Sequence, residues 1–317
     1  MPRRVSLLLS ACAFLCLAAP AQAASSRAWV SGRGTDTAGC GAVASPCRTL
    51  QYVLNNIIAP KGEIDILDPA GYGSMTINFA VNVINTGVGT AGVLASPGQN
   101  AVTINAAAGD GVNLQGLTIE GQGSGLNGVQ FNSGGSLGLA GSQVYGFTGV
   151  GVNFKPGNGA GVVADLTVSA TSIYGNGADD VVVQPQGGTL ARATFKDNCT
   201  VSFSPIGILS DGSASASGSV HTSVSNCAFG NISGQAVQAN GTAGKVHVMV
   251  ERSGFAHVET ALRADGSNAS ISLDSSIIAH TGSPTVSTGG GGLTTFGNNA
   301  INYTTNAASF TSSIGLQ

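Results

Sequence analysis

Charged side chains are scarce in this chain: Asp, Glu, Lys and Arg make up 9% of its 317 residues. Aromatic residues reach only 5%, and no run of about 20 apolar residues is long enough for a membrane-spanning helix. Apolar residues nevertheless account for 42%, so the chain can bury a core and is not of the disordered class. The 48 glycines follow no strict period of three, which excludes a collagen helix.

Basic residues are too few for a nucleic-acid-binding protein. Arg3 and Arg4 lie in the N-terminal segment, and without them 12 − 2 = 10 basic residues oppose 15 acidic ones, a net charge of −5. We therefore expect no nucleic-acid partner and, given the hydropathy, no membrane span.

The first residues have the pattern of a signal peptide, 1–23. Arg3 and Arg4 precede an apolar stretch over residues 5–19, and Ala21-Gln22-Ala23 is a small-x-small cleavage motif. We expect cleavage near Ala23 and a secreted or periplasmic product. The apolar run before Cys12 is very short, which disfavours a lipoprotein.

Four cysteines remain after cleavage, and an even number in an exported chain suggests disulfides. Cys40 and Cys47 close a short loop and are the natural first pair. Cys199 and Cys227 both follow Asn and are 28 residues apart. The repeat described below gives 29 residues for the same step, so the two side chains could instead be offset by one residue and remain reduced. No Cys-x-x-Cys spacing indicates zinc.

Residues 24–62 are expected to form an N-terminal cap. Leu50, Val53, Leu54, Ile57 and Ile58 have the i, i+3, i+4 spacing of one helical face. The helix is expected to begin after Ser45-Pro46 or at Thr49 and to end at Pro60 and Gly62. Near Ile64 and Ile66 the period becomes that of a strand.

Residues 63–317 carry an internal repeat of short strands. Apolar anchors recur at separations of 27, 29, 26 and 23 residues: Val168, Phe195, Val224, Val250 and Leu273. Positions two and four residues before the anchors are also apolar, except Thr222. Leu139 is a plausible earlier member of the series. A period-two pattern that recurs about every 25 residues predicts stacked strands, each burying one face.

A second row supports the same register. Val183, Ile208, Val237 and Leu262 each lie three residues before a polar turn residue that is followed by Gly. The turn residues are Gln186, Asp211, Asn240 and Asp265. Two strand rows and a turn row with one shared period indicate at least two strands per coil. An antiparallel β-sandwich, the alternative, predicts no such repeat.

The predicted fold is therefore all-β: a single-stranded parallel β-helix of roughly nine or ten coils, with a short N-terminal capping helix. The segments Trp-Val-Ser-Gly-Arg-Gly-Thr-Asp at 29–36, Ser-Pro-Cys-Arg-Thr-Leu-Gln at 45–51 and Leu-Asp-Pro-Ala-Gly-Tyr-Gly at 67–73 resemble the entry segment of exported right-handed parallel β-helix repeat proteins. Residues 224–229 and 295–299 resemble coils of that pectate-lyase-like superfamily. The resemblance implies a right-handed coil, which the periodicity alone does not. Its members include lyases, hydrolases, epimerases and adhesins, so it does not specify an activity.

The repeat also predicts one outward face that gathers the scarce charges. Positions three before the anchors are Asp165, Arg192, His221, His247 and Ser270; positions one after include Lys196, Glu251 and Asp274. A polysaccharide lyase needs a base and a cation or metal, which makes Arg192, Lys196, His221, His247 and Glu251 candidate catalytic residues. A merely solvated face carries such residues equally well.

Two further positions are interpreted structurally. Asp179 and Asp180 are expected in a turn. Asp211 and Asp265 flank Asn240, where calcium could bind, but Asp-Gly turn geometry alone accounts for these residues. We therefore expect no cofactor and no metal.

Two functions remain open at this stage. The first is a non-catalytic surface, adhesive or polysaccharide-binding protein, whose partner is a polysaccharide or a cell-surface glycan. The second is a polysaccharide-processing enzyme, a lyase, hydrolase or epimerase. Fold does not imply function, and the only Trp, Trp29, lies in the cap rather than in a carbohydrate cleft.

Overall fold

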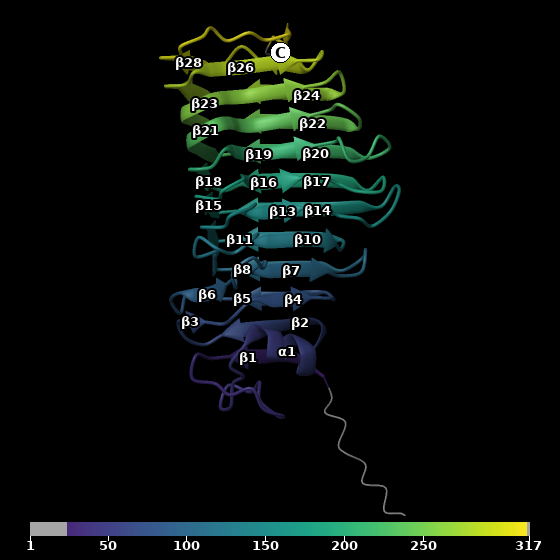
Figure 1. The fold of residues 1–317 in the computed structure, drawn as a ribbon, viewed down its shortest axis with the longest axis vertical. Coiled ribbons are helices and arrows are strands. Elements are labelled where there is room, and N and C mark those ends of the chain that lie inside the picture. The colour runs from purple at the N-terminus through teal and green to yellow at the C-terminus, as the bar shows by residue number, and fades with distance from the viewer. Residues whose placement is uncertain (1–23, 316–317) are drawn as a thin grey trace, which may run out of the picture.

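The computed structural model describes residues 24–315, so the predicted signal peptide and Cys12 lie outside the described residues. The chain winds into a rod of about nine turns (Figure 1). All pairings between its named strands are parallel, which confirms the β-helix and excludes the sandwich.

Each full coil contributes one strand to a 12-stranded sheet along one side of the rod. In order along the sheet these strands are β1 (Ser25–Val30), β2 (Ile58–Ile66), β5 (Val81–Ile84), β8 (Gly111–Gln115), β11 (Ser136–Ala140), β14 (Val163–Ser169), β17 (Leu190–Lys196), β20 (Ser219–Ser225), β22 (Lys245–Glu251), β24 (Ala269–Asp274), β27 (Gly292–Thr295) and β29 (Ser312–Ser313).

The other two sides of the coil belong to a 17-stranded sheet. One side consists of β3 (Ala70–Gly71), β6 (Ala91–Leu94), β9 (Leu117–Glu120), β12 (Gln143–Tyr145), β15 (Ser172–Tyr174), β18 (Cys199–Ser202), β25 (Ile277–Ala279) and β28 (Ala300–Asn302). The next consists of β4 (Met75–Ile77), β7 (Val102–Asn105), β10 (Val129–Ser133), β13 (Val152–Phe154), β16 (Asp179–Val183), β19 (Ile206–Asp211) and β26 (Ser283–Thr288). Two long strands, β21 (Cys227–Asn240) and β23 (Gly254–Asp265), run through both sides.

The anchor row is confirmed residue by residue. Val168 pairs with Phe195, Phe195 with Val224, Val224 with Val250, and Val250 with Leu273. All five side chains are fully buried. Leu139 pairs with Val168 and is confirmed as an earlier member. The row continues toward the N-terminus through Leu114 and Val83, where the repeat was too irregular to read.

The alignment predicted for the second row was wrong in its first coil, where Val183 was placed beside Ile208. Ile208, Val237 and Leu262 are in register, but Ile208 pairs with Val181 rather than with Val183. Gln184 therefore precedes Asp211 in the turn row, and Gln186 does not. A shift by two residues leaves every side chain on its original face, so alternation alone cannot detect it.

The cap closes the N-terminal end of the rod (Figure 1). Helix α1 (Leu50–Asn56) begins at Thr49, whose side chain accepts a hydrogen bond from the Tyr52 amide, and it buries Leu50, Val53 and Leu54. This apolar stripe covers the core and strand edges of the first coil.

The helix is shorter than the sequence predicted. Ile57 is its C-cap, and Ile58 already begins β2, which pairs with β1 and contains Pro60 and Gly62. Ile58 is β-branched, which favours a strand, and its buried apolar side chain packs in the core of the first coil.

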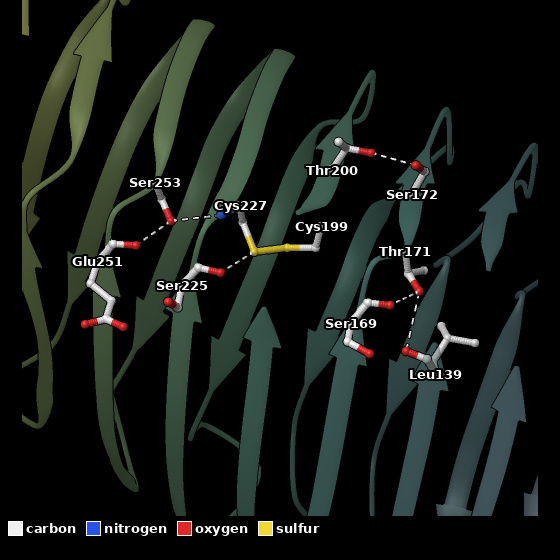
Figure 2. Close-up of a disulfide and its surroundings, with 10 residues drawn as sticks. All are labelled: Leu139, Ser169, Thr171, Ser172, Cys199, Thr200, Ser225, Cys227, Glu251 and Ser253. Carbon is white, nitrogen blue, oxygen red and sulfur yellow. Dashed lines mark hydrogen bonds between the residues drawn. A yellow bond between two sulfur atoms is a disulfide. The ribbon is translucent and has the colours of Figure 1, made fainter. Parts of the chain in front are cut away.

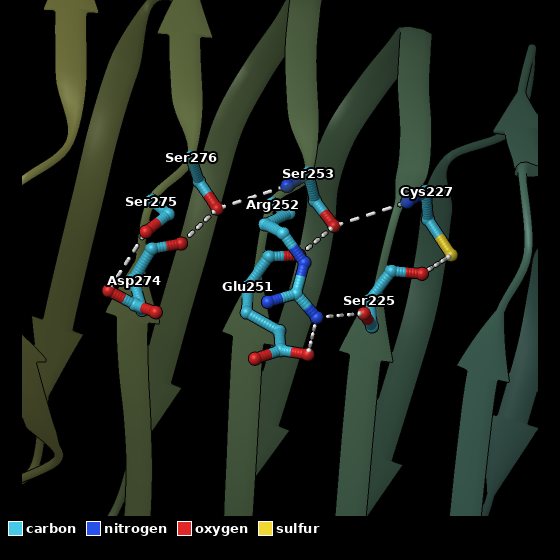
Figure 3. Close-up of polar contacts among 8 residues, drawn as sticks. All are labelled: Ser225, Cys227, Glu251, Arg252, Ser253, Asp274, Ser275 and Ser276. Carbon is cyan, nitrogen blue, oxygen red and sulfur yellow. Dashed lines mark hydrogen bonds and ion pairs between the residues drawn. The ribbon is translucent and has the colours of Figure 1, made fainter.

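A ladder of side chains, all buried except the half-buried Asn299, lines the corner that follows the 12-stranded sheet. Its members directly overlie one another on successive coils: Leu117, Ser142, Thr171, Cys199, Cys227, Ser253, Ser276 and Asn299. The Ser253 hydroxyl donates to the Glu251 carbonyl (2.8 Å) and accepts from the Cys227 amide (3.2 Å) (Figures 2 and 3). Ser276 repeats this arrangement toward Asp274 and Ser253. These bonds satisfy backbone groups that the sharp corner would otherwise leave buried and unpaired.

Both expected disulfides are present. Cys40 and Cys47 are joined with Cα atoms 5.0 Å apart in the cap. Cys199 and Cys227 are joined across adjacent coils with Cα atoms 4.7 Å apart (Figure 2). Both distances lie within the ordinary disulfide range.

Candidate functional site

The outward face of the 12-stranded sheet carries the row that the repeat predicted. Asp165 pairs with Arg192, Arg192 with His221, His221 with His247, and His247 with Ser270. Because outward positions alternate with buried anchors along each strand, all five side chains point away from the core.

A shallow groove of about 420 Å³ lies over strands β17, β20, β22 and β24. On one side it is lined by Arg192, His221, His247 and Ser270. On the other it is lined by the next outward row, Thr194, Ser223, Met249 and Ser272. Since each row crosses from coil to coil, the groove runs along the rod. A second hollow of about 360 Å³ lies over β8, β11 and β14 of the same sheet.

Arg192 is already engaged by a carboxylate. Its Nε and Nη2 donate to the two oxygens of Asp165 at 2.6 and 2.7 Å, a bidentate pair, and both side chains remain substantially exposed. The pair contributes little to stability because solvent screens it. It does orient the guanidinium toward the groove and neutralises most of its charge.

The two imidazoles are neighbours. The rings of His221 and His247 lie 5.3 Å apart between centroids, and His247 Nδ1 shares a hydrogen bond of 2.7 Å with the Ser270 hydroxyl. Partial burial, together with nearby His221 and Lys245, lowers the pKa of His247 below its ordinary value. His247 is therefore neutral at pH 7 and can accept a proton or a hydrogen bond.

The predicted catalytic set does not converge. Lys196 and Glu251 lie at the far end of their strands, at the corner, and do not line the groove. Lys196 faces Asp197 at 3.5 Å. Glu251 receives a bond of 2.5 Å from Arg252, which also donates to the Ser225 hydroxyl at 3.2 Å (Figure 3). Only Arg192, His221 and His247 share one site.

The carboxylates of the turn row are occupied by protein donors. Asp211 accepts hydrogen bonds from Gln184 and Asn240, at 2.5 and 2.9 Å. Asp265 accepts bonds from Gln238, Arg263 and Thr288. Amide and guanidinium groups thus hold the oxygens that a calcium ion would need.

One cluster within residues 24–315 has three potential metal ligands close together: Asp36, Cys40 and Cys47. The two sulfur atoms are bonded to each other, and Asp36 accepts from the Arg48 and Thr49 amides and the Thr49 hydroxyl. Asp36 thus fixes the residues at the start of α1.

Asp179 and Asp180 were misplaced from the sequence, and Lys245 was overlooked. Asp179 and Asp180 begin strand β16 rather than a turn, and Asp180 is fully buried. Lys245, at the start of β22, lies close enough to influence His247. The repeat could have revealed Lys245, since it occupies the outward position five residues before an anchor.

Comparisons with known proteins give no further guide. No protein-family model matches the chain, and no curated protein or solved structure matches it. Within the described part of the chain, no helix is both long and apolar enough to cross a bilayer.

Proposed function

We propose that this chain is an exported, non-catalytic β-helix protein that holds an acidic polysaccharide along the groove between Arg192 and Ser270. The observation that carries the proposal is the single row of Arg192, His221 and His247, continuous over adjacent coils and open to solvent. A groove that runs along a rod fits a polymer better than a compact small molecule, which pockets normally enclose.

The local charge favours an anionic ligand although the whole chain is acidic. Asp165 and Arg192 compensate each other, and Lys245 adds a positive charge near His247. Among the described residues, Arg192 Nη1 has no hydrogen-bond partner, so it can donate to a uronate carboxylate. The histidine rings and the hydroxyls of Thr194, Ser223 and Ser270 supply partners for sugar hydroxyls.

Export is part of the proposal. The residues 1–23 have the signal-peptide pattern, and two disulfides are compatible with an extracellular protein.

The arrangement supports binding more than chemistry. A lyase needs a cation at the carboxylate beside the proton that is removed, yet Arg192 is paired with Asp165, and Lys196 and Glu251 are paired elsewhere. One observation favours the second candidate, a uronate lyase: neutral His247 is suited to act as a base.

One experiment separates the two candidates. Purified protein is titrated with polygalacturonate, alginate and neutral dextran, and the same mixtures are followed by ultraviolet absorbance for unsaturated products. We expect binding to a polyuronate without product. Replacing Arg192→Ala and His247→Ala together should weaken it about tenfold, or about 1.4 kcal/mol. Lys196→Ala, on the same strand as Arg192 but outside the groove, is the control and should bind normally. Product formation that is lost in His247→Ala would instead establish the lyase.

A further inference from the structure

A second outward feature lies on the 17-stranded sheet, at the corner that follows β25 and β28 and that lies within β23. Three exposed rings are stacked there on successive coils. The centroids of His257 and His280 are 5.3 Å apart, and those of His280 and Tyr303 are 5.1 Å apart, with planes within 10° of parallel. Tyr303 is 80% exposed.

The backbone under these rings is in the left-handed region. The φ values are 56° at His257, 53° at His280 and 52° at Tyr303, and Phe203 and Asn231 occupy the same corner at 60° and 54°. The preceding coils place Gly146 and Gly175 there, also with positive φ. Glycine adopts this conformation without steric cost, whereas an aromatic residue does not.

The three rings therefore occupy backbone positions that glycine would adopt with less steric strain. Because the rings are exposed, burial of apolar surface offsets little of this strain. Phe203, 62% exposed, continues the same corner. Strained residues of this kind persist where the displayed side chain has a role, and the inference runs from the observed strain to that role. Stacking between neighbouring rings offsets part of the cost.

A groove of about 500 Å³ adjoins the stack. His257, His280 and Tyr303 form one side, and Ser233, Glu259 and Thr305 line the other. A Cβ atom at Gly282 would lie 2.8 Å from each Glu259 carboxylate oxygen, so Gly282 leaves room for that carboxylate inside the groove. Its φ is not in the left-handed region, so the glycine contributes space beside the Glu259 carboxylate rather than backbone freedom.

We propose that this groove binds an uncharged polysaccharide whose chain lies parallel to the rod. The edges of the stacked rings line the groove, where the imidazole nitrogens, the Tyr303 hydroxyl and the Glu259 carboxylate bond to sugar hydroxyls. Glu259 is the one carboxylate in the lining and repels a uronate, so its preference is opposite to that of the Arg192 groove. The repeat of about 4.8 Å between coils offers a sugar chain equivalent contacts on successive coils.

The decisive variant is His280→Gly, which restores the residue type of the earlier corners. A binding role predicts unchanged thermal stability with at least a tenfold loss of affinity. A purely structural stack predicts a lower melting temperature. Glu259→Gln is expected to retain stability and to reduce the discrimination against polyuronate.

The probes are galactomannan, xyloglucan and dextran, with polygalacturonate for comparison, measured by affinity electrophoresis on the exported protein. Retardation by a neutral polymer that disappears in His280→Gly but persists in the Arg192→Ala/His247→Ala variant supports the proposal. Absence of retardation by all three neutral polymers overturns it, as does a His280→Gly variant that binds normally. Polyuronate binding that is lost in the Arg192→Ala/His247→Ala variant, together with no retardation by any neutral polymer, would support the first groove and refute this one.

Discussion

Cys199 and Cys227 occupy two consecutive steps of the corner ladder in which the neighbouring coils use buried hydroxyls. Thr171 precedes them and Ser253 follows them, and Cys227 Sγ also contacts the Ser225 carbonyl at 3.5 Å (Figure 2). The disulfide thus links two coils covalently where the other coils are linked by hydrogen bonds.

Replacing both residues tests the two roles separately. The Cys199→Ser/Cys227→Ser variant should lose about 3 to 4 kcal/mol of unfolding free energy, because the closed loop of 28 residues no longer restricts the unfolded chain. Cys199→Ala/Cys227→Ala should lose about 1 kcal/mol more, since alanine cannot continue the hydroxyl ladder. Denaturant unfolding with and without reductant measures both. Equal stability of the alanine variant and the oxidised parent would contradict this account.

The anchor row predicts a large effect at Val250. Val250→Asp places a carboxylate in a fully buried position between Val224 and Leu273, and the expected loss is roughly 3 to 5 kcal/mol. The neighbouring Met249 points outward, so Met249→Asp should change stability by less than about 1 kcal/mol. Thermal unfolding of the pair measures the difference; similar midpoints for the two variants would refute the register.

Asp180 predicts a pH dependence of stability. Burial raises its pKa to about 7, against the effect of hydrogen bonds from Asn176 and Ser204, so the folded state keeps a proton that the unfolded state loses near pH 4. Stability from this group is present at acidic pH and declines as pH rises from about 4 to about 7, by at most about 4 kcal/mol. The raised pKa of Asp179, also caused mainly by burial, acts in the same direction.

Asp180→Asn should remove most of that decline, because an amide makes the bonds of the protonated acid. In urea unfolding from pH 4 to pH 8, the free energy of unfolding of the variant should therefore increase relative to that of the parent as pH rises. Asp197→Asn, with a largely exposed carboxylate, is the control. A parent whose stability rises over this pH range while the variant follows it in parallel would show that Asp180 ionises normally.

Thr281 offers a stabilising substitution. Its hydroxyl is buried without a hydrogen-bond partner among the described residues, on the inward side where the adjacent coils place Ile232 and Val258. Thr281→Val keeps the shape and removes the unpaired group, so we expect a gain of about 1 to 2 kcal/mol. Differential scanning calorimetry tests this, with Thr285→Val as the matched control because Thr285 donates to the Ser309 carbonyl and should lose stability.

The fold was readable from the sequence because burial imposes a period of two within each strand and the anchors recur from coil to coil. Val250 and Leu273 could be aligned from sequence alone. Coils before Leu139 could not, because strands as short as Val81–Ile84 are separated by long Gly- and Asn-rich loops. The disulfide step was ambiguous for a local reason. Asp197 and Asn198 both have backbone φ values in the left-handed region, whereas the next corner has only Asn226 in that conformation. The corner before Cys199 therefore contains one more residue than the corner before Cys227, and the two cysteines still lie in register.

The candidate site was only partly readable. Register alone placed His221 beside His247, but it could not show that Asp165 binds Arg192 with two hydrogen bonds or that Lys196 faces Asp197. The aromatic stack was missed because His257, His280 and Tyr303 lie at a corner, outside the alternating pattern. The sparse aromatic composition also gave no reason to expect exposed rings, yet the coil stacks two imidazoles and one phenol at this corner.

The most direct test of the proposed function is to obstruct the Arg192 groove. Ser223 lies on its lining, whereas Ser219, on the same strand and facing the same side, does not. Ser223→Trp should abolish binding of polygalacturonate in a calorimetric titration, and Ser219→Trp should leave the affinity within about twofold of the parent, or about 0.4 kcal/mol. Full polyuronate binding by a correctly folded Ser223→Trp variant would contradict the proposal that this groove holds the polysaccharide.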